Sequence, residues 1–425
     1  MENGKYINRL YDKKLEFYLK SVGAVLISGP KFCGKSTTAA RYAKTIIDLT
    51  KNATRDYYVS LAKTSSDHFL NFGDKPLLID EWQIVSFLWN DIKASISESG
   101  FFGQYILTGS VTDNTKAINP EIRHTGTGRI ITMMMRPMTL YESGDSNGLV
   151  SISSLKEGSF SPCLCSKSID DYAFYICRGG WPLSIGQEKE VAVQQAINFY
   201  EGSVAEDIFS LTDIPLRRDV EKSRRLFRSY ARHIGSQASN EELRADLGEG
   251  MDDGTFKKYL LALERLYISD ELPAWNPNLR SKTAIRTKNT RYFVDPSIAT
   301  SALGVGPEGL FKDMHTFGFL FESLAIRDLK AYCSVINAEL YHYRDKSGRE
   351  ADGVIVFRDG DWALVEIKLG GFEDVDSAAK KLLKLSEDIV EDKEKPVFLM
   401  VVTKDGVAYQ REDGVYVVPL ACLKD

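Results

Sequence analysis

The sequence predicts an α/β protein of several parts, and three observations lead to that fold class. Over residues 1–145, short apolar runs alternate with helical stretches, which is typical of a parallel sheet with helices on both faces. Residues 216–290 are mainly helical. Residues 315–425 begin with a helix and continue as strands in which apolar and polar residues alternate. A chain of 425 residues also exceeds what one hydrophobic core usually supports.

The first part, residues 1–145, contains three candidate strands, each apolar throughout. They are Ala24–Ser28, Pro76–Asp80 and Tyr105–Thr108. Gly29 and Pro30 end the first strand, and a helix is expected from Lys35 to about Leu49. A parallel sheet built this way places the carboxyl ends of its strands at one edge, where ligands bind.

A phosphate-binding loop follows the first strand. Its residues match the pattern G-x4-G-K-[ST] in full, and Thr37 continues it: Gly29, Pro30, Lys31, Phe32, Cys33, Gly34, Lys35, Ser36 and Thr37. Backbone N–H groups of such a loop surround a phosphate, and the helix that follows adds its positive dipole end. Lys35 is expected to reach the β- and γ-phosphates and Ser36 to ligate Mg²⁺. The plain alternative is a glycine turn beside a surface lysine.

Two carboxylates supply the second half of a nucleotide site. The strand Leu77–Ile79 leads into Asp80 and Glu81, about 45 residues after the loop. Asp80 is expected to hold Mg²⁺, and Glu81 to orient the attacking water. Thr108 ends the third strand, where a hydroxyl would sense the γ-phosphate; an ordinary strand exit is the alternative. For Asp80 and Glu81, the alternative is that they are only the charged end of a buried strand.

Cys33 lies inside the loop, next to the start of the predicted helix. A thiol at a helix N-terminus tends to be reactive, so alkylation of Cys33 is expected to block ATP binding. A buried and inert side chain is an equal alternative.

With these motifs the chain resembles the AAA-type ATPases of bacteria and archaea that carry a C-terminal domain of unknown function. Further matches are Gly128-Arg129, the run Arg136–Glu142, and Gly179-Gly180-Trp181-Pro182. The loop departs modestly, with Lys-Phe-Cys at its centre and Ser36 in place of the commoner Thr. The resemblance implies ATP and Mg²⁺ as cofactors and ATP hydrolysis. It also implies an arginine that stabilises the γ-phosphate: Arg129 first, then Arg123 and Arg136. The alternative is an arginine on an ordinary surface strand.

The middle of the chain divides in two. Residues 146–215 are expected to be a Ser- and Gly-rich linker followed by helices, and 216–314 a winged helix. Residues 216–290 hold 15 Lys and Arg against 11 Asp and Glu, a mild excess of positive charge. A winged helix would place basic residues of its second helix against DNA: Lys257, Lys258 and Arg265. A winged helix that contacts protein or is purely structural is the alternative.

The last part, residues 315–425, contains Asp352 and, after thirteen intervening residues, Glu366-Ile367-Lys368. This arrangement resembles the core of PD-(D/E)XK nucleases, in which two carboxylates bind Mg²⁺ and the lysine activates a water. The same resemblance makes Glu322 the upstream acidic ligand. The pattern by itself is weak, since many strand hairpins contain it.

The hairpin between these residues decides whether they meet. A two-residue loop at Asp359-Gly360 would turn Asp352 away from Glu366. A three-residue loop, Arg358 to Gly360, closed by a left-handed glycine would place Asp352 opposite Glu366. A five-residue loop, 357–361, keeps the same register, and an irregular bulge could also bring the two carboxylates together. We predict the odd-length register.

Composition limits the function classes. The net charge of −5 gives no overall basic field, and no apolar run approaches a membrane span. The N-terminus has no signal-peptide pattern, and six scattered cysteines are typical of a cytoplasmic protein with free thiols. The sequence thus predicts an ATPase acting on DNA, with a homo-oligomer possible. A nucleotide-dependent switch that recruits a protein partner and cleaves nothing is the alternative.

Overall fold

The computed structural model describes residues 6–110, 128–208, 220–248, 251–277, 287–345, 347–390 and 394–425. The chain divides into two compact units. The N-terminal unit comprises residues 4–137 and 263–268, and the C-terminal unit chiefly residues 138–262 and 269–425. No described helix is long and apolar enough to cross a membrane. The six cysteines are all free thiols.

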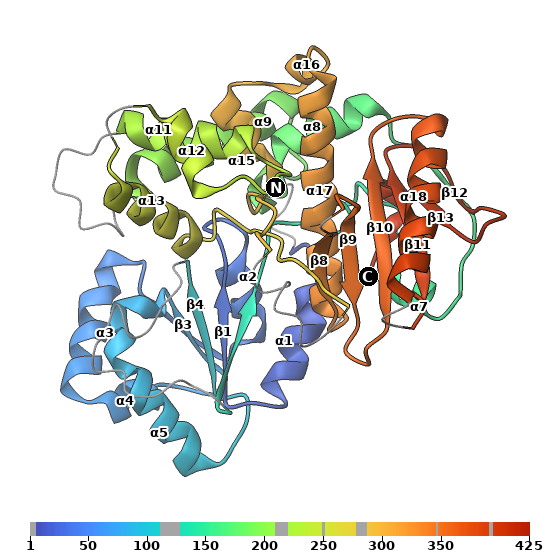
Figure 1. The fold of residues 1–425 in the computed structure, drawn as a ribbon. Coiled ribbons are helices and arrows are strands. Elements are labelled where there is room, and N and C mark those ends of the chain that lie inside the picture. Colours follow the sequence, from blue (N-terminus) through green and yellow to red (C-terminus); the bar gives the residue numbers. More distant parts are fainter. Residues whose placement is uncertain are drawn as a thin grey trace. The chain divides into compact units, whose positions relative to one another are not determined.

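The N-terminal unit is built on a five-stranded parallel sheet in the order β2-β3-β4-β1-β5 (Figure 1). Its strands are β1 (Ala24–Ser28), β2 (Thr45–Asp48), β3 (Leu77–Asp80), β4 (Tyr105–Gly109) and β5 (Ile130–Met134). Its helices are α1 (Tyr11–Leu19), α2 (Lys35–Tyr42), α3 (Asn52–Thr64), α4 (Ser66–Leu70), η1 (Trp82–Leu88) and α5 (Trp89–Ser99). Residues of α3, α4, η1 and α5 form one hydrophobic core with the strands. The predicted α/β class and parallel sheet are confirmed.

One predicted helix is shorter than expected. The helix after the phosphate loop ends at Tyr42 rather than near Leu49, and Thr45–Asp48 forms the edge strand β2. Thr45, Ile46 and Ile47 are β-branched, which favours a strand over a helix.

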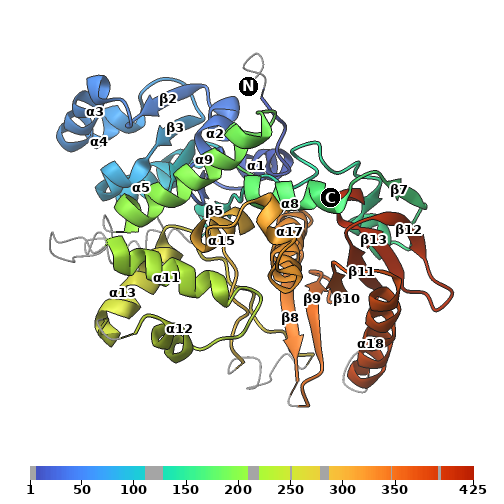
Figure 2. The ribbon, with the colours of Figure 1, turned by 90° about the horizontal axis from the view of Figure 1, so that it is seen from above.

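The C-terminal unit contains a seven-stranded mixed sheet, in the order β7-β12-β13-β11-β10-β9-β8, and a two-stranded sheet, β14-β6. The strands are β6 (Val150–Ser151), β7 (Cys163–Cys165), β8 (Glu339–Arg344), β9 (Glu350–Val356), β10 (Trp362–Lys368), β11 (Phe398–Thr403), β12 (Gly406–Gln410), β13 (Tyr416–Pro419) and β14 (Leu423–Lys424). The helix α18 (Phe372–Val390) packs on one face of the large sheet, and Figure 2 shows the long α17 (Met314–Val335) on the other.

The expected linker at residues 146–168 is instead part of these sheets. Here β6 pairs with β14, and β7 extends the large sheet beside β12. The short helix α7 (Ile152–Lys156) lies between β6 and β7 in the sequence. Strand addition uses backbone N–H and C=O groups, so Ser- and Gly-rich sequence does not prevent it.

The helical part of this unit has two helices where the sequence predicts them. They are α12 (Asn240–Asp246), which begins at a Ser239–Glu242 capping box, and α13 (Asp253–Arg265). Antiparallel bridges join Ser269 to Phe293 and Leu272 to Thr290, after α13 and within the part predicted to be a winged helix. The remaining helices are α8 (Ile169–Arg178), η2 (Pro182–Ser184), α9 (Lys189–Gly202), η3 (Ser203–Asp207), α11 (Val220–Arg232), α15 (Pro296–Leu303), α16 (Pro307–Leu310) and η4 (Leu420–Cys422).

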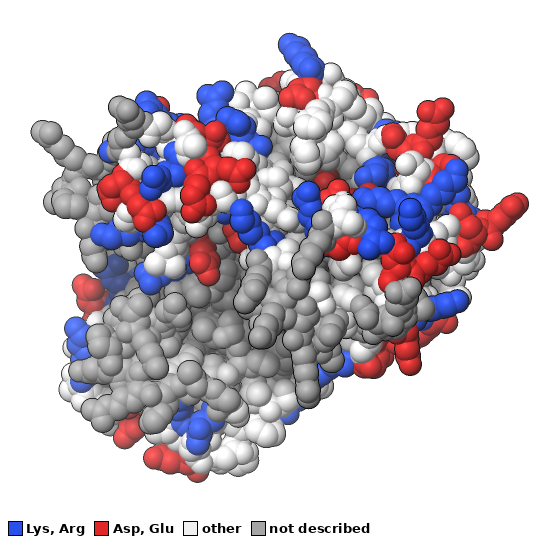
Figure 3. All heavy atoms as spheres, in the orientation of Figure 1, with Lys and Arg blue, Asp and Glu red and all other residues white. Residues whose placement is uncertain are grey.

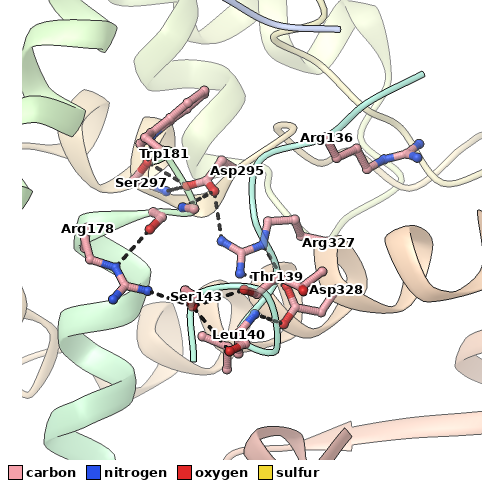
Figure 4. Close-up of polar contacts among 12 residues, drawn as sticks. Arg136, Thr139, Leu140, Ser143, Arg178, Trp181, Asp295, Ser297, Arg327 and Asp328 are labelled. Atoms are coloured by element: carbon pink, nitrogen blue, oxygen red, sulfur yellow. Dashed lines mark hydrogen bonds and ion pairs between the residues drawn. The ribbon is translucent and has the colours of Figure 1, made fainter. Parts of the chain in front are cut away.

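A buried ionic network lies at the centre of this unit (Figure 4). Arg327 on α17 donates to Asp295 at 2.9 Å and to Asp328 at 2.7 Å, and all three residues are buried. Asp328 also accepts the backbone N–H of Leu140 at 2.9 Å, and Asp295 that of Gly180 at 2.9 Å.

The same network explains two of the motifs that carry the family resemblance. The Met138 N–H donates to the Gly180 carbonyl at 2.6 Å. A Cβ atom at Gly180 would lie 2.1 Å from the Met138 oxygen, so only glycine fits there. Trp181 donates from its indole to Ser297 at 3.0 Å. The runs Arg136–Glu142 and Gly179–Pro182 thus meet in the C-terminal unit through Met138 and Gly180.

Candidate functional site

The phosphate loop has the backbone that its glycines permit. Gly34, with φ of 98°, caps α2 in the left-handed region, and Gly29 has φ of 144°. A Cβ atom at Gly29 would lie 2.1 Å from the Met135 carbonyl oxygen at the end of β5. Both positions therefore require glycine.

Lys35 is folded onto the loop that precedes it. Its side chain is buried, and its ammonium donates to the carbonyl oxygens of Gly29 at 3.0 Å and Pro30 at 2.8 Å. An ammonium carries donors in three directions, so the same group could exchange these carbonyls for phosphate oxygens.

Asp80 joins the ends of three strands. Its Oδ1 accepts a hydrogen bond from Ser36 Oγ at 2.7 Å and another from Thr108 Oγ1. Ser36 follows β1, while Asp80 and Thr108 lie at paired positions of β3 and β4. The structure thus brings together three of the predicted residues, and their hard oxygen atoms suit Mg²⁺.

Glu81 has an unusual backbone. Its φ of 56° lies in the left-handed region, which non-glycine residues adopt rarely and chiefly at functional sites. Its Oε2 accepts hydrogen bonds from Gln83 Nε2 and, at 3.5 Å, from Ser110 Oγ. The carboxylate therefore lies next to β4, within the same strand-end cluster.

Arg129 is at the wrong end of the sheet to serve the loop of its own chain. It precedes β5, and its Nε donates to Ser97 on α5 at 2.6 Å. Because Ala24 pairs with Ile130 and Ser28 with Met134, Arg129 lies beside the start of β1. The length of the strand, roughly 3.3 Å per residue, separates it from the loop. Arg136 follows the correct end, and Arg123 lies outside the described residues.

Cys33 is fully buried, and its thiol lies 3.4 Å from the Met135 carbonyl oxygen, to which it donates. This geometry favours the inert alternative for the closed loop. Alkylation of Cys33 would require the loop to open first.

The C-terminal hairpin has the predicted odd-length register. Trp362 pairs with Val356 and Val365 with Gly353, which continues to Glu366 opposite Asp352. The Phe357 N–H donates to the Asp361 carbonyl at 2.8 Å, and Gly360, with φ of 99°, is left-handed. The three-residue loop is therefore confirmed, and Asp352 and Glu366 lie on one face.

Glu366 is the most enclosed acid of this second cluster. It is fully buried, and its Oε1 accepts from Lys368 at 2.8 Å and from Lys381 at 2.7 Å. Its Oε2 is buried without a hydrogen-bond partner. Lys381 has no signal in the sequence, because α18 carries several lysines and only the packing shows which one turns toward the sheet.

The other two acids lie near Glu366 but point elsewhere. Asp352 accepts the Ile367 N–H at 2.7 Å, and Glu322 accepts from the Tyr292 hydroxyl. Burial, and then the Asp352 charge, raise the pKa of Glu322 well above its usual value. In the described residues no three His, Cys, Asp or Glu side chains are arranged to hold a metal ion. Glu322, Asp352 and Glu366 are close enough for their charges to interact. Their carboxylate groups do not converge on one point.

Asp352 should make stability depend on pH. Burial, and then the Glu366 charge, raise the pKa of Asp352 to about 7. Between about pH 4 and pH 7 the folded protein keeps a proton that the unfolded chain has lost, so stability falls as pH rises through this window. We expect Asp352→Asn to raise the free energy of unfolding, and the gain to be about 2 kcal/mol larger at pH 8 than at pH 5. Urea unfolding in EDTA measures this. Asp359→Asn, on the exposed hairpin loop, is the control and should show no such gain.

Comparison with known families gives a match over the part of the chain that holds the first site. Residues 21–143 match the family model described as an AAA domain. This part of the chain is therefore similar to AAA-type P-loop domains. The AAA-type domain is followed by two matches to domains of unknown function, DUF8612 at residues 169–309 and DUF4143 at 317–423. No curated protein matches the chain.

Solved structures similar to the whole chain are distant. A Walker-type ATPase of Pyrococcus abyssi is 14% identical, with a TM-score of 0.44, covering 71% of this chain and 97% of its own. The ORC2 protein of Aeropyrum pernix, solved as ADPNP and ADP complexes, is 12% identical, with a TM-score of 0.33 and coverages of 73% and 97%. A STAND protein with a tetratricopeptide-repeat sensor from Pyrococcus horikoshii is 13% identical, with a TM-score of 0.26 and coverages of 78% and 47%.

Acidic side chains lie among the basic residues of the helices predicted to contact DNA. Lys257 and Lys258 on α13 are exposed, and Lys257 pairs with Asp253 at 2.7 Å. On the face shown in Figure 3, Lys and Arg side chains over α11, α12 and α13 alternate with Asp and Glu. DNA contact through Lys257, Lys258 and Arg265 stays a prediction.

Proposed function

We propose that the protein binds Mg-ATP at the AAA-type domain and hydrolyses it. One observation carries the proposal. The Ser36 and Thr108 hydroxyls both donate to one carboxylate oxygen of Asp80, beside the phosphate loop that contains Lys35. Lys35 and the loop N–H groups would bind the phosphates, and Ser36 and Asp80 would hold Mg²⁺. Bound Mg²⁺ would neutralise charge on the β- and γ-phosphates.

The residues of this chain would supply the rest of the chemistry. Glu81 would orient the attacking water and accept its proton. Thr108 would contact the γ-phosphate once Asp80 turns to the metal. Arg136 is the described arginine at the correct end of β5, and Arg129 would serve only the loop of another copy in a homo-oligomer.

Phosphate release by purified protein tests the proposal. The wild type should release phosphate from ATP with Mg²⁺ and stop when EDTA is added. Absence of both nucleotide binding and phosphate release would contradict it.

We propose a second function for the C-terminal unit: Mg²⁺-dependent cleavage of DNA phosphodiester bonds at Glu366, with Glu322 and Asp352 turning toward the metal once it binds. The buried, unpartnered Oε2 of Glu366 favours it, since a carboxylate oxygen without a donor fits a cation. Lys368 would activate the water. Figure 3 shows Lys and Arg over α18, with Asp and Glu around them. The basic side chains would meet a phosphate backbone.

Nicking of supercoiled plasmid tests this second function. With Mg²⁺ or Mn²⁺, the wild type should nick plasmid, whereas Glu366→Gln and Lys368→Ala should lose at least about 100-fold in rate. Lys312→Ala, an exposed lysine outside α18, is the control and should keep its activity. Wild-type protein that binds ATP but never nicks DNA would favour the alternative, a nucleotide-dependent switch that recruits a protein partner.

A further inference from the structure

The segment that precedes the family match lies against the phosphate loop. The AAA match begins at residue 21, and no motif of the sequence covers residues 6–12. Within this segment the Arg9 side chain is only 5% exposed. A buried arginine needs acceptors for its donors, and those acceptors show what it holds.

The Arg9 guanidinium spans the two backbone segments beside the loop. Its Nη1 donates to the carbonyl of Cys33 at 2.6 Å, and its Nη2 donates to that of Arg136 at 2.8 Å. Cys33 is in the middle of the phosphate loop, and Arg136 follows the end of β5. A single planar side chain therefore fixes the loop relative to the neighbouring strand.

The hydrogen bond from Arg9 to the Cys33 carbonyl also sets the direction of the next backbone N–H, that of Gly34. In a trans peptide the C=O and the following N–H point in opposite directions. Because the Cys33 carbonyl points to Arg9, the Gly34 N–H points away from Arg9. Backbone N–H groups are what such a loop offers to phosphate, so Arg9 orients one of them without touching the nucleotide.

The segment itself is anchored on both sides. Asp12 accepts the Arg9 backbone N–H at 2.8 Å and the Tyr6 hydroxyl at 2.6 Å. Tyr6 also lies 3.1 Å from the Thr38 hydroxyl on α2, the helix that follows the loop. Arg9 is thus linked, through Asp12 and Tyr6, to α2, the helix whose N-terminus would face the phosphate.

We propose that Arg9 is a positioning residue of the nucleotide site, which holds the phosphate loop in its binding conformation through the Cys33 and Arg136 carbonyls. This inference rests on the proposed ATP binding and adds a residue outside the AAA match. Loss of Arg9 weakens ATP and ADP alike, since both place a phosphate in the loop.

Three variants test it by the Kd for a fluorescent ATP analogue, each measured well below its own Tm. Arg9→Met removes both hydrogen bonds and should raise the Kd about 10- to 100-fold. Arg9→Lys can keep one of them and should lie between Arg9→Met and the wild type. Arg41→Met removes the same charge from a residue whose guanidinium lies 4.7 Å from the Tyr6 ring, and should stay within about threefold. The Arg9 defect should persist at high salt, whereas a loss due to charge alone is screened.

A second measurement needs no nucleotide. Amide hydrogen exchange at residues 33–36 and alkylation of Cys33 should both be faster in Arg9→Met than in Arg41→Met. If the wild type binds no ATP, the proposed function fails while this measurement still decides the role of Arg9. Unchanged Kd and unchanged exchange in Arg9→Met would overturn the inference. Should Arg9→Met not fold, unchanged values in Arg9→Lys would do the same.

Discussion

We expect Lys35→Ala to lose tight ATP binding, with a Kd at least about 100-fold above the wild-type value. Lys35 already donates to two backbone carbonyls of the loop, at 3.0 Å and 2.8 Å, and would exchange them for phosphate oxygens. Each hydrogen bond to a charged group is worth about 1.5–3 kcal/mol, and two of them exceed a hundredfold in affinity. Equilibrium titration with a fluorescent ATP analogue measures the loss.

Lys44→Ala is the control for overall charge, because Lys44 is exposed after α2. Its affinity should stay within about threefold of the wild type. Equal Kd values for Lys35→Ala and Lys44→Ala would remove Lys35 from the phosphate site.

Glu81→Gln should bind ATP and fail to turn it over. An amide oxygen cannot take the proton of the attacking water, so we expect phosphate release to fall about 100- to 1000-fold while the Kd changes little. Glu98→Gln, the same substitution at an exposed position of α5, should keep the wild-type rate. Phosphate release by Glu81→Gln at the wild-type rate would show that the Asp80–Glu81 assignment is wrong.

Sequence alone predicted the parts whose chemistry is local. The phosphate loop and the strand that ends in Asp80 each depend on a few consecutive residues. The register of the Asp352–Glu366 hairpin was predictable for a different reason. A period of two residues makes only one loop parity compatible with both carboxylates on one face.

The remainder depends on distant partners. Arg129 was placed at the nucleotide because its motif resembles that of a family, but strand direction puts it at the opposite end of β5. Arg9 has no local signal, since its acceptors are 24 and 127 residues away. Likewise, β7 has a weak strand sequence and forms because an edge of the large sheet is there to pair with.

The pairing of β6 with β14 has a consequence for synthesis on the ribosome. All five strands of the parallel sheet lie between Ala24 and Met134, so that sheet can pair early in translation. Val150 must wait for Leu423, and Ser153 for Asp425, whose carboxylate accepts its N–H at 2.8 Å. At about 5–20 residues per second, that wait is roughly 15–50 s. Every nascent chain therefore passes through a stage in which all strands of the parallel sheet have been synthesised, while the two-stranded sheet still lacks β14.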